Sequence, residues 1–364
     1  MLSLLLHLEG IESVVLETHD REYIERRVRA GVLEQSTVDL LCAMGAGDRL
    51  EREGLVHSGI GVRFGGLPHR IDFDALTGGR AITIYGQQEV VKDLLAARSE
   101  AVVFNATAVS VDAGEPSVRY TSDGEERELR ADFVAGCDGF HGPSRAAVPG
   151  TSFEHVYPIG WLGILAGVAP SVDEVTYCHH ERGFALHSMR SPTVSRLYLQ
   201  CAPDEDIAAW SDDRIWDELR TRMRVPGWSL RDGPILERGV VGMHSFVHEP
   251  MQNERVFLAG DAAHIVPATG AKGMNLAVAD ARVLADAIAH WYRTGDDSRL
   301  RGYTDACLPR VWRAQRFSSW MTSTLHTDGD PFRFRVQRAE LDYVFSSNAA
   351  ATALAENYVG LRDG

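Results

Sequence analysis

The chain has 364 residues, 45% of them hydrophobic and 24% charged, a composition typical of a globular protein with two or three domains. Its 51 acidic and 37 basic residues give a formal net charge of −14, and no Lys/Arg-rich run offsets it, which argues against nucleic-acid binding. The five cysteines are scattered without metal-ligand spacing, which predicts no metal site and a reducing, cytoplasmic environment. The apolar start lacks a basic flank and is too short to span a membrane.

The first elements follow the second half of a nucleotide-binding βαβ unit. Residues 2–8 predict a helix, and residues 14–17 predict a short apolar strand that finishes in Glu17. An acid at the end of such a strand can accept hydrogen bonds from the hydroxyls of an adenosine ribose. A basic stretch then leads into a helix predicted over residues 36–53.

The next segments predict a hairpin, a helix and three strands. The hairpin covers residues 59–73 and the amphipathic helix residues 87–99. The strands are expected at residues 101–111, 117–121 and 126–135.

The residue pattern of the sequence changes near residue 156. From there to residue 241 aromatic and β-branched residues alternate, which predicts a separate, mainly antiparallel sheet with one helix near residues 213–223. Residues 256–261 predict a buried strand, and most of the remaining chain is predicted to be helical. The element order therefore predicts a mixed α/β fold in which an inserted sheet interrupts a nucleotide-binding domain.

The most specific motif is Gly260–His264, which follows this strand and precedes a long helix. Its glycine lets the backbone approach a ligand, and Asp261 can accept a hydrogen bond from a sugar-chain hydroxyl. The helix start at Met274 and Asn275 can present amides to an electron-rich ring. A tight strand-to-helix turn would explain the glycines alone, so the whole run favours a ligand site.

Residues 260–267, with Gly136–Gly139 upstream, resemble the single-component FAD-dependent aromatic hydroxylases. Four further segments are similar to the 4-hydroxybenzoate 3-monooxygenase family in particular: Arg27–Gln35, Tyr85–Gln87, Arg182–Leu186 and Glu356–Gly360. The resemblance runs from residue 2 to about residue 361. It implies an FAD-binding domain at residues 1–154, a substrate-binding sheet domain with its return strand at 155–265, and a helical region at 266–364.

The resemblance also implies which residues hold FAD. They are Glu17, Arg27, Val28, Arg29, Ala30, Gly31, Val32, Gln87, Asp138, Arg196, Asp261, Gly273, Met274 and Asn275. Arg29 can pair with the pyrophosphate, and the backbone around Ala30–Val32 can bond the isoalloxazine edge. Without the resemblance, Arg27 and Arg29 would be interpreted as a solvated basic face.

The predicted substrate pocket begins with Ser188 and Arg190, two residues apart on one face of a strand. Tyr198 lies on the next strand, across a turn expected at Ser191-Pro192. A guanidinium flanked by two hydroxyls suits a planar carboxylate. Ala268 and Thr269 complete the predicted substrate contacts, although Ala268 stands where the family usually has a second proline.

Tyr177 and Tyr358 resemble the family's phenol-activating pair, and His57 the outer end of its proton relay. Removal of the phenolic proton raises electron density ortho to the oxygen, and paired phenols with a titratable histidine can carry that proton away. Taken singly, the tyrosines would be interpreted as core aromatics and His57 as a surface residue.

The implied reaction is hydroxylation of 4-hydroxybenzoate to 3,4-dihydroxybenzoate with NAD(P)H and O2, through a flavin hydroperoxide, in a homodimer. The nicotinamide donor is expected at Tyr23, Arg27, Arg29, His141 and Arg145. Asp20 and Glu22 would repel a 2′-phosphate, which favours NADH or no preference. The alternatives are a related hydroxylase of another hydroxybenzoate, or a flavin-free protein that binds aromatic acids without chemistry.

One expected motif is missing. No GxGxxG phosphate loop occurs, and the nearest candidate, Gly45-Ala46-Gly47, lies inside the predicted helix rather than after a strand. The resemblance places such a loop just before residues 2–8. The sequence-based expectation is a misplaced start codon or, second, a true truncation.

Overall fold

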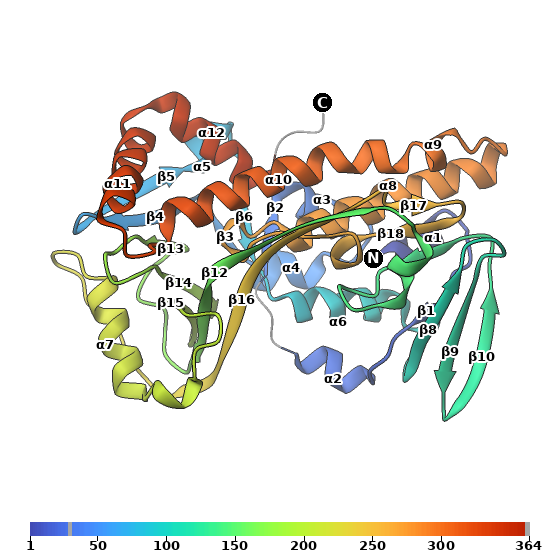
Figure 1. The fold of residues 1–364 in the computed structure, drawn as a ribbon, viewed down its shortest axis with the longest axis horizontal. Helices are drawn as coiled ribbons and strands as arrows, with labels where there is room; N and C mark the ends of the chain where they lie inside the picture. The colour runs from blue at the N-terminus through green and yellow to red at the C-terminus, as the bar shows by residue number, and fades with distance from the viewer. Residues whose placement is uncertain (28–30, 361–364) are drawn as a thin grey trace.

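The computed structural model describes residues 1–27 and 31–360, which form a mixed α/β fold (Figure 1). The expected FAD contacts Val28, Arg29 and Ala30 lie outside the described residues. The helices are α1 (Leu2–Leu8), α2 (Arg21–Arg26), α3 (Gln35–Ala43), α4 (Asp48–Glu53), α5 (Phe73–Thr77), α6 (Gln87–Arg98), α7 (Asp212–Arg222), α8 (Gly273–Thr294), α9 (Ser298–Arg301), α10 (Tyr303–Leu325), α11 (Pro331–Ser346) and α12 (Asn348–Val359).

Nineteen strands in the described residues form five sheets. They are β1 (Val15–Leu16), β2 (Val32–Glu34), β3 (Leu55–His57), β4 (Gly59–Phe64), β5 (Leu67–Asp72), β6 (Ile82–Ile84), β7 (Val102–Val103), β8 (Ala106–Asp112), β9 (Ser117–Ser122), β10 (Glu125–Arg130), β11 (Val134–Gly136), β12 (Thr151–Ala166), β13 (Thr176–Cys178), β14 (Ala185–Ser191), β15 (Val194–Cys201), β16 (Ile235–Glu249), β17 (Gln252–Asn253), β18 (Val256–Leu258) and β19 (His264–Ile265).

The nucleotide-binding half contains two short parallel pairings. Strand β1 pairs with β7, and β11 pairs with β18, which is the strand predicted to return from the inserted sheet. Strand β18 is completely apolar and buried, as expected for a strand that is covered on both faces. Helices α1, α8 and α10 pack against it around Phe257, Leu284 and Val311. The pairing of Gly136 with Leu258 places the ends of β11 and β18 side by side.

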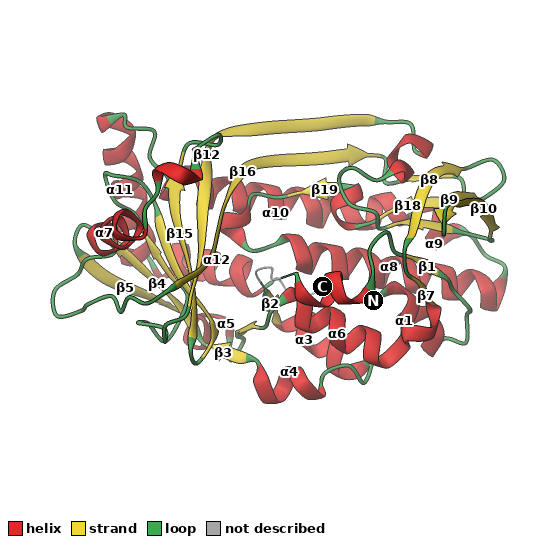
Figure 2. Cartoon of the chain, turned by 90° about the horizontal axis from the view of Figure 1, so that it is seen from below, coloured by secondary structure: helices red, strands yellow, loops and turns green. Residues whose placement is uncertain are grey.

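The inserted sheet has eight strands in the order β19-β16-β12-β15-β14-β13-β4-β5. All neighbouring pairs are antiparallel except β13 and β4, so the predicted mainly antiparallel sheet is confirmed. The long strands β12 and β16 cross the molecule from this sheet toward β18 and β19 (Figure 2). The sheet also includes β4 and β5, which come from the first of the three predicted residue ranges.

Two layers of helices enclose the large sheet. Helix α7 covers one face through Ile215, Leu219 and Met223, packed on Leu197 and Leu199. The other face meets α5, α10, α11 and α12 and forms the largest apolar core. The substrate-pocket residues lie in this sheet, so their strands are held from both faces.

Three predicted elements differ from the structure because local turns interrupt them. The helix expected over residues 36–53 is two helices, α3 and α4, because Gly45 has φ +73° and a Cβ on Gly47 would lie 2.6 Å from the Cys42 sulfur. The strand expected over residues 101–111 breaks into β7 and β8 at Asn105, which has φ +54°. The strand expected over residues 126–135 divides into β10 and β11.

Candidate active site

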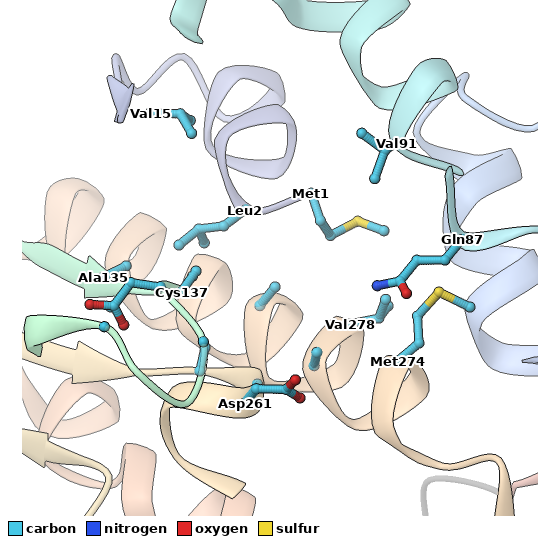
Figure 3. A pocket seen from close by; sticks show the side chains of 18 of the residues that line it. Met1, Leu2, Val15, Gln87, Val91, Ala135, Cys137, Asp261, Met274 and Val278 are labelled. Carbon is cyan, nitrogen blue, oxygen red and sulfur yellow. The ribbon is translucent and has the colours of Figure 1, made fainter. Parts of the chain in front are cut away.

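One cavity of about 2570 Å³ extends from the nucleotide-binding strands to the eight-stranded sheet. Its walls include predicted residues from both ends: Glu17, Arg27, Gly31, Val32, Gln87, Asp138, His141, Asp261, Gly273 and Met274 at one end, and Tyr177, Ser188, Arg190, Arg196, Tyr198 and Ala268 at the other. Figure 3 shows the first end, where Gln87, Met274 and Asp261 surround the same space as Met1 and Cys137. The two predicted sites therefore share one volume.

The acidic residues at the nucleotide end lie at strand ends. Glu17 follows β1 directly and its carboxylate accepts the His19 backbone N–H at 2.8 Å, while the side chain still lines the cavity. Asp261 is exposed in the turn after β18. Gly260 has φ +63°, and a Cβ there would lie 3.0 Å from the Ala277 Cβ of α8. The turn can thus approach α8 only with glycine.

The middle of the cavity meets three backbone segments that suit a planar ring. Gln87 is the first residue of α6, and Gly273 and Met274 begin α8, a 22-residue helix whose first amides are free of intrahelical partners. Gly31 lies against β6 so closely that a Cβ would be 1.7 Å from the Tyr85 carbonyl oxygen. Backbone donors and glycine clearance are what a flavin edge requires, so the residues present fit FAD.

The side chain of Asn275 bonds to other parts of the protein rather than pointing to the cofactor site. Its amide oxygen accepts the Glu34 backbone N–H and the Thr37 hydroxyl, each at 2.9 Å, and its amide nitrogen donates to the Val32 carbonyl. The buried side chain therefore ties β2 to the start of α8. Only its backbone remains for a cofactor.

The polar pole of the cavity is built on the hairpin β14–β15. The strands close from Ser191 to Val194, which confirms the predicted turn, and Ser188 lies opposite Arg196. The Nε atoms of Arg190 and Arg196 are buried and have no hydrogen-bond partner among the described residues. Burial lowers the pKa of Arg190, and the nearby Tyr198 opposes this effect. Two arginines whose buried Nε atoms lack a hydrogen-bond partner in the described chain, with the Glu237 carboxylate as the nearby opposite charge, provide a site for an anion.

The opposite pole is a pair of buried phenols. The hydroxyls of Tyr177 and Tyr358 are 2.5 Å apart, and the Tyr177 hydroxyl also lies 3.2 Å from the Thr269 carbonyl oxygen, to which it can donate. Only Tyr177 lines the cavity, whereas Tyr358 and Thr269 lie behind it. Burial raises the pKa of Tyr177 well above its ordinary value, as does the adjacent Tyr358. Burial also raises the pKa of Tyr358, so both phenols are neutral at physiological pH.

Comparisons with known proteins agree with this arrangement. The profile of the FAD binding domain family matches residues 1–318. The p-hydroxybenzoate hydroxylase of Acinetobacter baylyi is 46% identical over 373 residues, covering 99% of this chain and 92% of that protein. The chain belongs to the p-hydroxybenzoate hydroxylase family. It is an FAD-dependent aromatic hydroxylase.

More distant relatives share the fold. Rifampicin monooxygenase of Streptomyces venezuelae is 28% identical over 305 residues, which cover 76% of this chain and 58% of that protein. The crystal structure of p-nitrophenol 4-monooxygenase PnpA from Pseudomonas putida DLL-E4 superimposes with a TM-score of 0.84 at 18% identity, covering 100% of this chain and 95% of that one. Aklavinone-11 hydroxylase, solved with FAD and aklavinone, gives a TM-score of 0.74 at 18% identity over 89% of this chain and 66% of that one.

His57 of the hydroxylase is a core residue. It ends β3 and is only 3% exposed, which differs from the surface position that the residue alone suggests. Its Nδ1 accepts the Val175 backbone N–H at 3.3 Å, two residues before Tyr177. Burial lowers the pKa of His57 to about 4. Within residues 1–27 and 31–360, no hydrogen bond joins His57 to either phenol.

Only some of the residues predicted to contact the nicotinamide donor line the cavity. His141 and Arg27 line the cavity, whereas Tyr23 and Arg145 are not among its lining residues. Arg145 donates to the carbonyls of Phe140 and Ala262 at 2.6 and 3.2 Å. Its guanidinium therefore braces the loop after β18. Asp138 likewise caps a turn through Ser144, although its side chain reaches the cavity.

Two residues of the site were not predicted from the sequence. Trp161 lines the cavity with its ring 4.7 Å from that of Tyr198, and its indole N–H donates to His326 at 2.6 Å. Gly163 provides space, since a Cβ there would lie 2.9 Å from an Arg196 nitrogen. Both residues lie on β12, where Gly163 pairs with Tyr198, and this contact between distant segments leaves no local signal in the sequence.

Other site classes find no support in the described residues. No group of three or more His, Cys, Asp or Glu side chains in this part of the chain could hold a metal ion. Among the helices described, none is long and apolar enough to cross a membrane.

Proposed function

We propose that this hydroxylase converts 4-hydroxybenzoate to 3,4-dihydroxybenzoate with O2 and a reduced nicotinamide. The observation that supports the proposal is the placement of an anion-binding pole and a proton-accepting pole in one cavity, which Trp161 also lines. Such a cavity suits an aromatic ring that carries a carboxylate at one end and a phenol at the other. The name of the Acinetobacter baylyi relative points to the same substrate.

In the proposed binding step, Arg190 receives the carboxylate, with Ser188 and Tyr198 as neighbouring hydroxyl donors. The unpartnered Nε atoms of Arg190 and Arg196 then gain a negatively charged acceptor, which adds to the attraction between Arg190 and Glu237. Because the strands carrying these residues are held from both faces, little conformational entropy is lost when the ligand binds. This pole fixes which ring carbon faces the flavin.

In the proposed proton step, the Tyr177 oxygen accepts the phenolic proton of the substrate while Tyr177 passes its own proton to Tyr358. Tyr358 in turn releases its hydroxyl proton toward His57, the predicted outer end of the relay, and from there to solvent. The 2.5 Å separation of the two hydroxyls suits this transfer. The substrate becomes a phenolate, whose ortho carbon is electron-rich. The FAD group, when bound and reduced, activates O2 and supplies the electrophilic oxygen that this carbon accepts. Burial of the phenols keeps bulk water from the reacting ring.

The test is product formation by the purified chain supplied with FAD, NADH or NADPH, and 4-hydroxybenzoate. We expect 3,4-dihydroxybenzoate, and Arg190→Gln should weaken substrate binding by roughly tenfold to a hundredfold, because a charge-assisted hydrogen bond contributes about 1.5–3 kcal/mol. Arg182→Gln is the matched control, since Arg182 is exposed and pairs with Glu218 outside the cavity. Reductant oxidation that is indifferent to 4-hydroxybenzoate would reject the substrate assignment.

The proposed reductant is NADH, or either nicotinamide without preference. Asp20 caps α2 by accepting the Tyr23 N–H at 2.7 Å, and Glu22 pairs with Arg26 on the same helix. These carboxylates make the area unfavourable for a 2′-phosphate. The ratio of kcat/KM for NADH to kcat/KM for NADPH tests this proposal, and a large preference for NADPH would contradict it.

We also propose that the enzyme works in the cytoplasm as a homodimer. All five cysteines are free thiols, which suits a reducing compartment. Sedimentation velocity measures the mass, and a single species at the monomer mass would contradict the dimer.

A further inference from the structure

A second cavity, of about 280 Å³, is lined by a largely different set of α8 residues from the large cavity. Helices α3, α8, α10 and α12 contribute its walls. Four cationic side chains line it, Lys272, Arg282, Arg310 and Arg313, against the two carboxylates of Glu34 and Asp286. This local excess of two positive charges contrasts with the net charge of −14 for the whole chain. The cavity is too small for a drug-sized molecule but has room for a small ion.

Arg310 gives this cavity an unsatisfied donor set. Its Nε and Nη2 atoms are buried, and neither has a hydrogen-bond partner in the described parts of the chain. A buried donor without a partner destabilises the folded chain, and a charged donor does so more strongly. Both atoms belong to the planar fork that binds oxyanions through two parallel hydrogen bonds.

The inner wall of the cavity is connected to the phenol pair. Lys272 is buried and donates to Glu34 at 2.6 Å and to the backbone carbonyl of Tyr358 at 2.9 Å. Asn357 and Gly360, on either side of that tyrosine along α12 and its end, also line the cavity. An anion in the cavity would therefore lie close to the ion pair that holds the Tyr358 backbone.

We propose that this cavity is a binding site for a small oxyanion of the phosphate type, held by the Arg310 fork with Arg313 at its exposed side. The ligand satisfies the two Arg310 nitrogens that lack a hydrogen-bond partner among the described residues. Lys272 and Glu34 already neutralise each other, so they form the floor of the site rather than its binding group. The site lies outside the substrate and flavin cavity, and its occupancy does not depend on the proposed reaction.

The test is calorimetric titration of the full chain with inorganic phosphate at constant ionic strength. We expect the parent chain to bind phosphate saturably at one site. Arg310→Gln should weaken the phosphate affinity at least tenfold. Arg310→Lys keeps the charge but not the planar guanidinium, so it should weaken the affinity by an intermediate factor. Arg301→Gln is the matched control, because Arg301 ends α9, pairs with Asp297 and does not line the cavity. Its affinity should stay within twofold of the parent chain.

Two results would overturn the proposal. One is phosphate affinity that is unchanged in Arg310→Gln, or absent in the parent chain. The other is a loss on Arg190→Gln in place of Arg310→Gln, which would assign the bound phosphate to the substrate pocket. If circular dichroism shows that Arg310→Gln does not fold, Arg313→Gln carries the same comparison with the same control.

Discussion

Tyr177→Phe is the most informative single change, because it removes one oxygen from the phenol pair and keeps the ring. That oxygen lies 2.5 Å from the Tyr358 hydroxyl and 3.2 Å from the Thr269 carbonyl, and both partners are buried. Each group left without a partner costs about 1–3 kcal/mol of folding free energy. For catalysis the loss is larger, since a positioned proton acceptor contributes roughly 10²- to 10⁴-fold. We expect kcat to fall by about a hundredfold or more.

The assay measures 3,4-dihydroxybenzoate formed per reductant consumed, together with the dissociation constant for 4-hydroxybenzoate. Binding should change little, because Arg190 at the other pole is untouched, so kcat should fall much more than affinity. Tyr303→Phe is the matched control: this tyrosine is also fully buried, and its hydroxyl donates to the Leu258 carbonyl at 2.9 Å away from the cavity. Normal hydroxylation by Tyr177→Phe would refute the proton path, as would an equal loss in the control.

Two further predictions concern stability and the cofactor. Burial lowers the pKa of His187 to about 4 and that of His326 to about 3, so as the pH falls below about 6.5 the unfolded chain takes up protons that the folded chain does not. The free energy of unfolding should therefore drop by about 1.4 kcal/mol per pH unit for each histidine between pH 6.5 and 4, and urea unfolding that is flat across this range would contradict it. Gly31→Ala places a Cβ 1.7 Å from the Tyr85 carbonyl oxygen, which should cost about 1–3 kcal/mol and weaken FAD binding, whereas Gly114→Ala, in an exposed turn, should do neither. Equal FAD titration curves for these two variants would show that the clearance at Gly31 is not needed.

The hairpin that carries Ser188 and Arg190 is predictable from the sequence because the relevant rules are local. A spacing of two puts Ser188 and Arg190 on one face of a strand, and a proline-containing turn brings the next strand back beside it. The register that results, Ser188 opposite Arg196, follows from the closure at Ser191 and Val194. The return strand β18 is also recognisable from its apolar pattern.

Other features depend on contacts between distant segments, which no local pattern carries. His57 is hydrophilic and precedes a serine, yet the packing of β3 on β6 and the loop before β13 bury it. The division of the helix expected over residues 36–53 needs the close approach of Gly47 to Cys42, which is visible only in three dimensions. In the sequence, Trp161 is one of several apolar residues of β12. Its position beside Tyr198 becomes apparent only from the strand pairing, in which Tyr198 lies opposite Gly163, two residues after Trp161.

The electrostatics of the two poles explain why the phenols, rather than carboxylates, receive the proton. Burial lowers the pKa of Arg190 and raises that of Tyr177, so burial disfavours the charged form of both side chains. A substrate carboxylate at Arg190 stabilises the charged guanidinium. A permanent anion beside Tyr177, in contrast, would oppose formation of the substrate phenolate. Neutral tyrosines can accept a proton and pass one on without adding charge to the site. A Tyr358→Glu variant should therefore bind 4-hydroxybenzoate but raise the pKa of the bound phenol, an effect visible as a shift of its absorbance titration to higher pH. A titration identical to that of the parent enzyme would show that charge at this position does not control ionisation of the substrate.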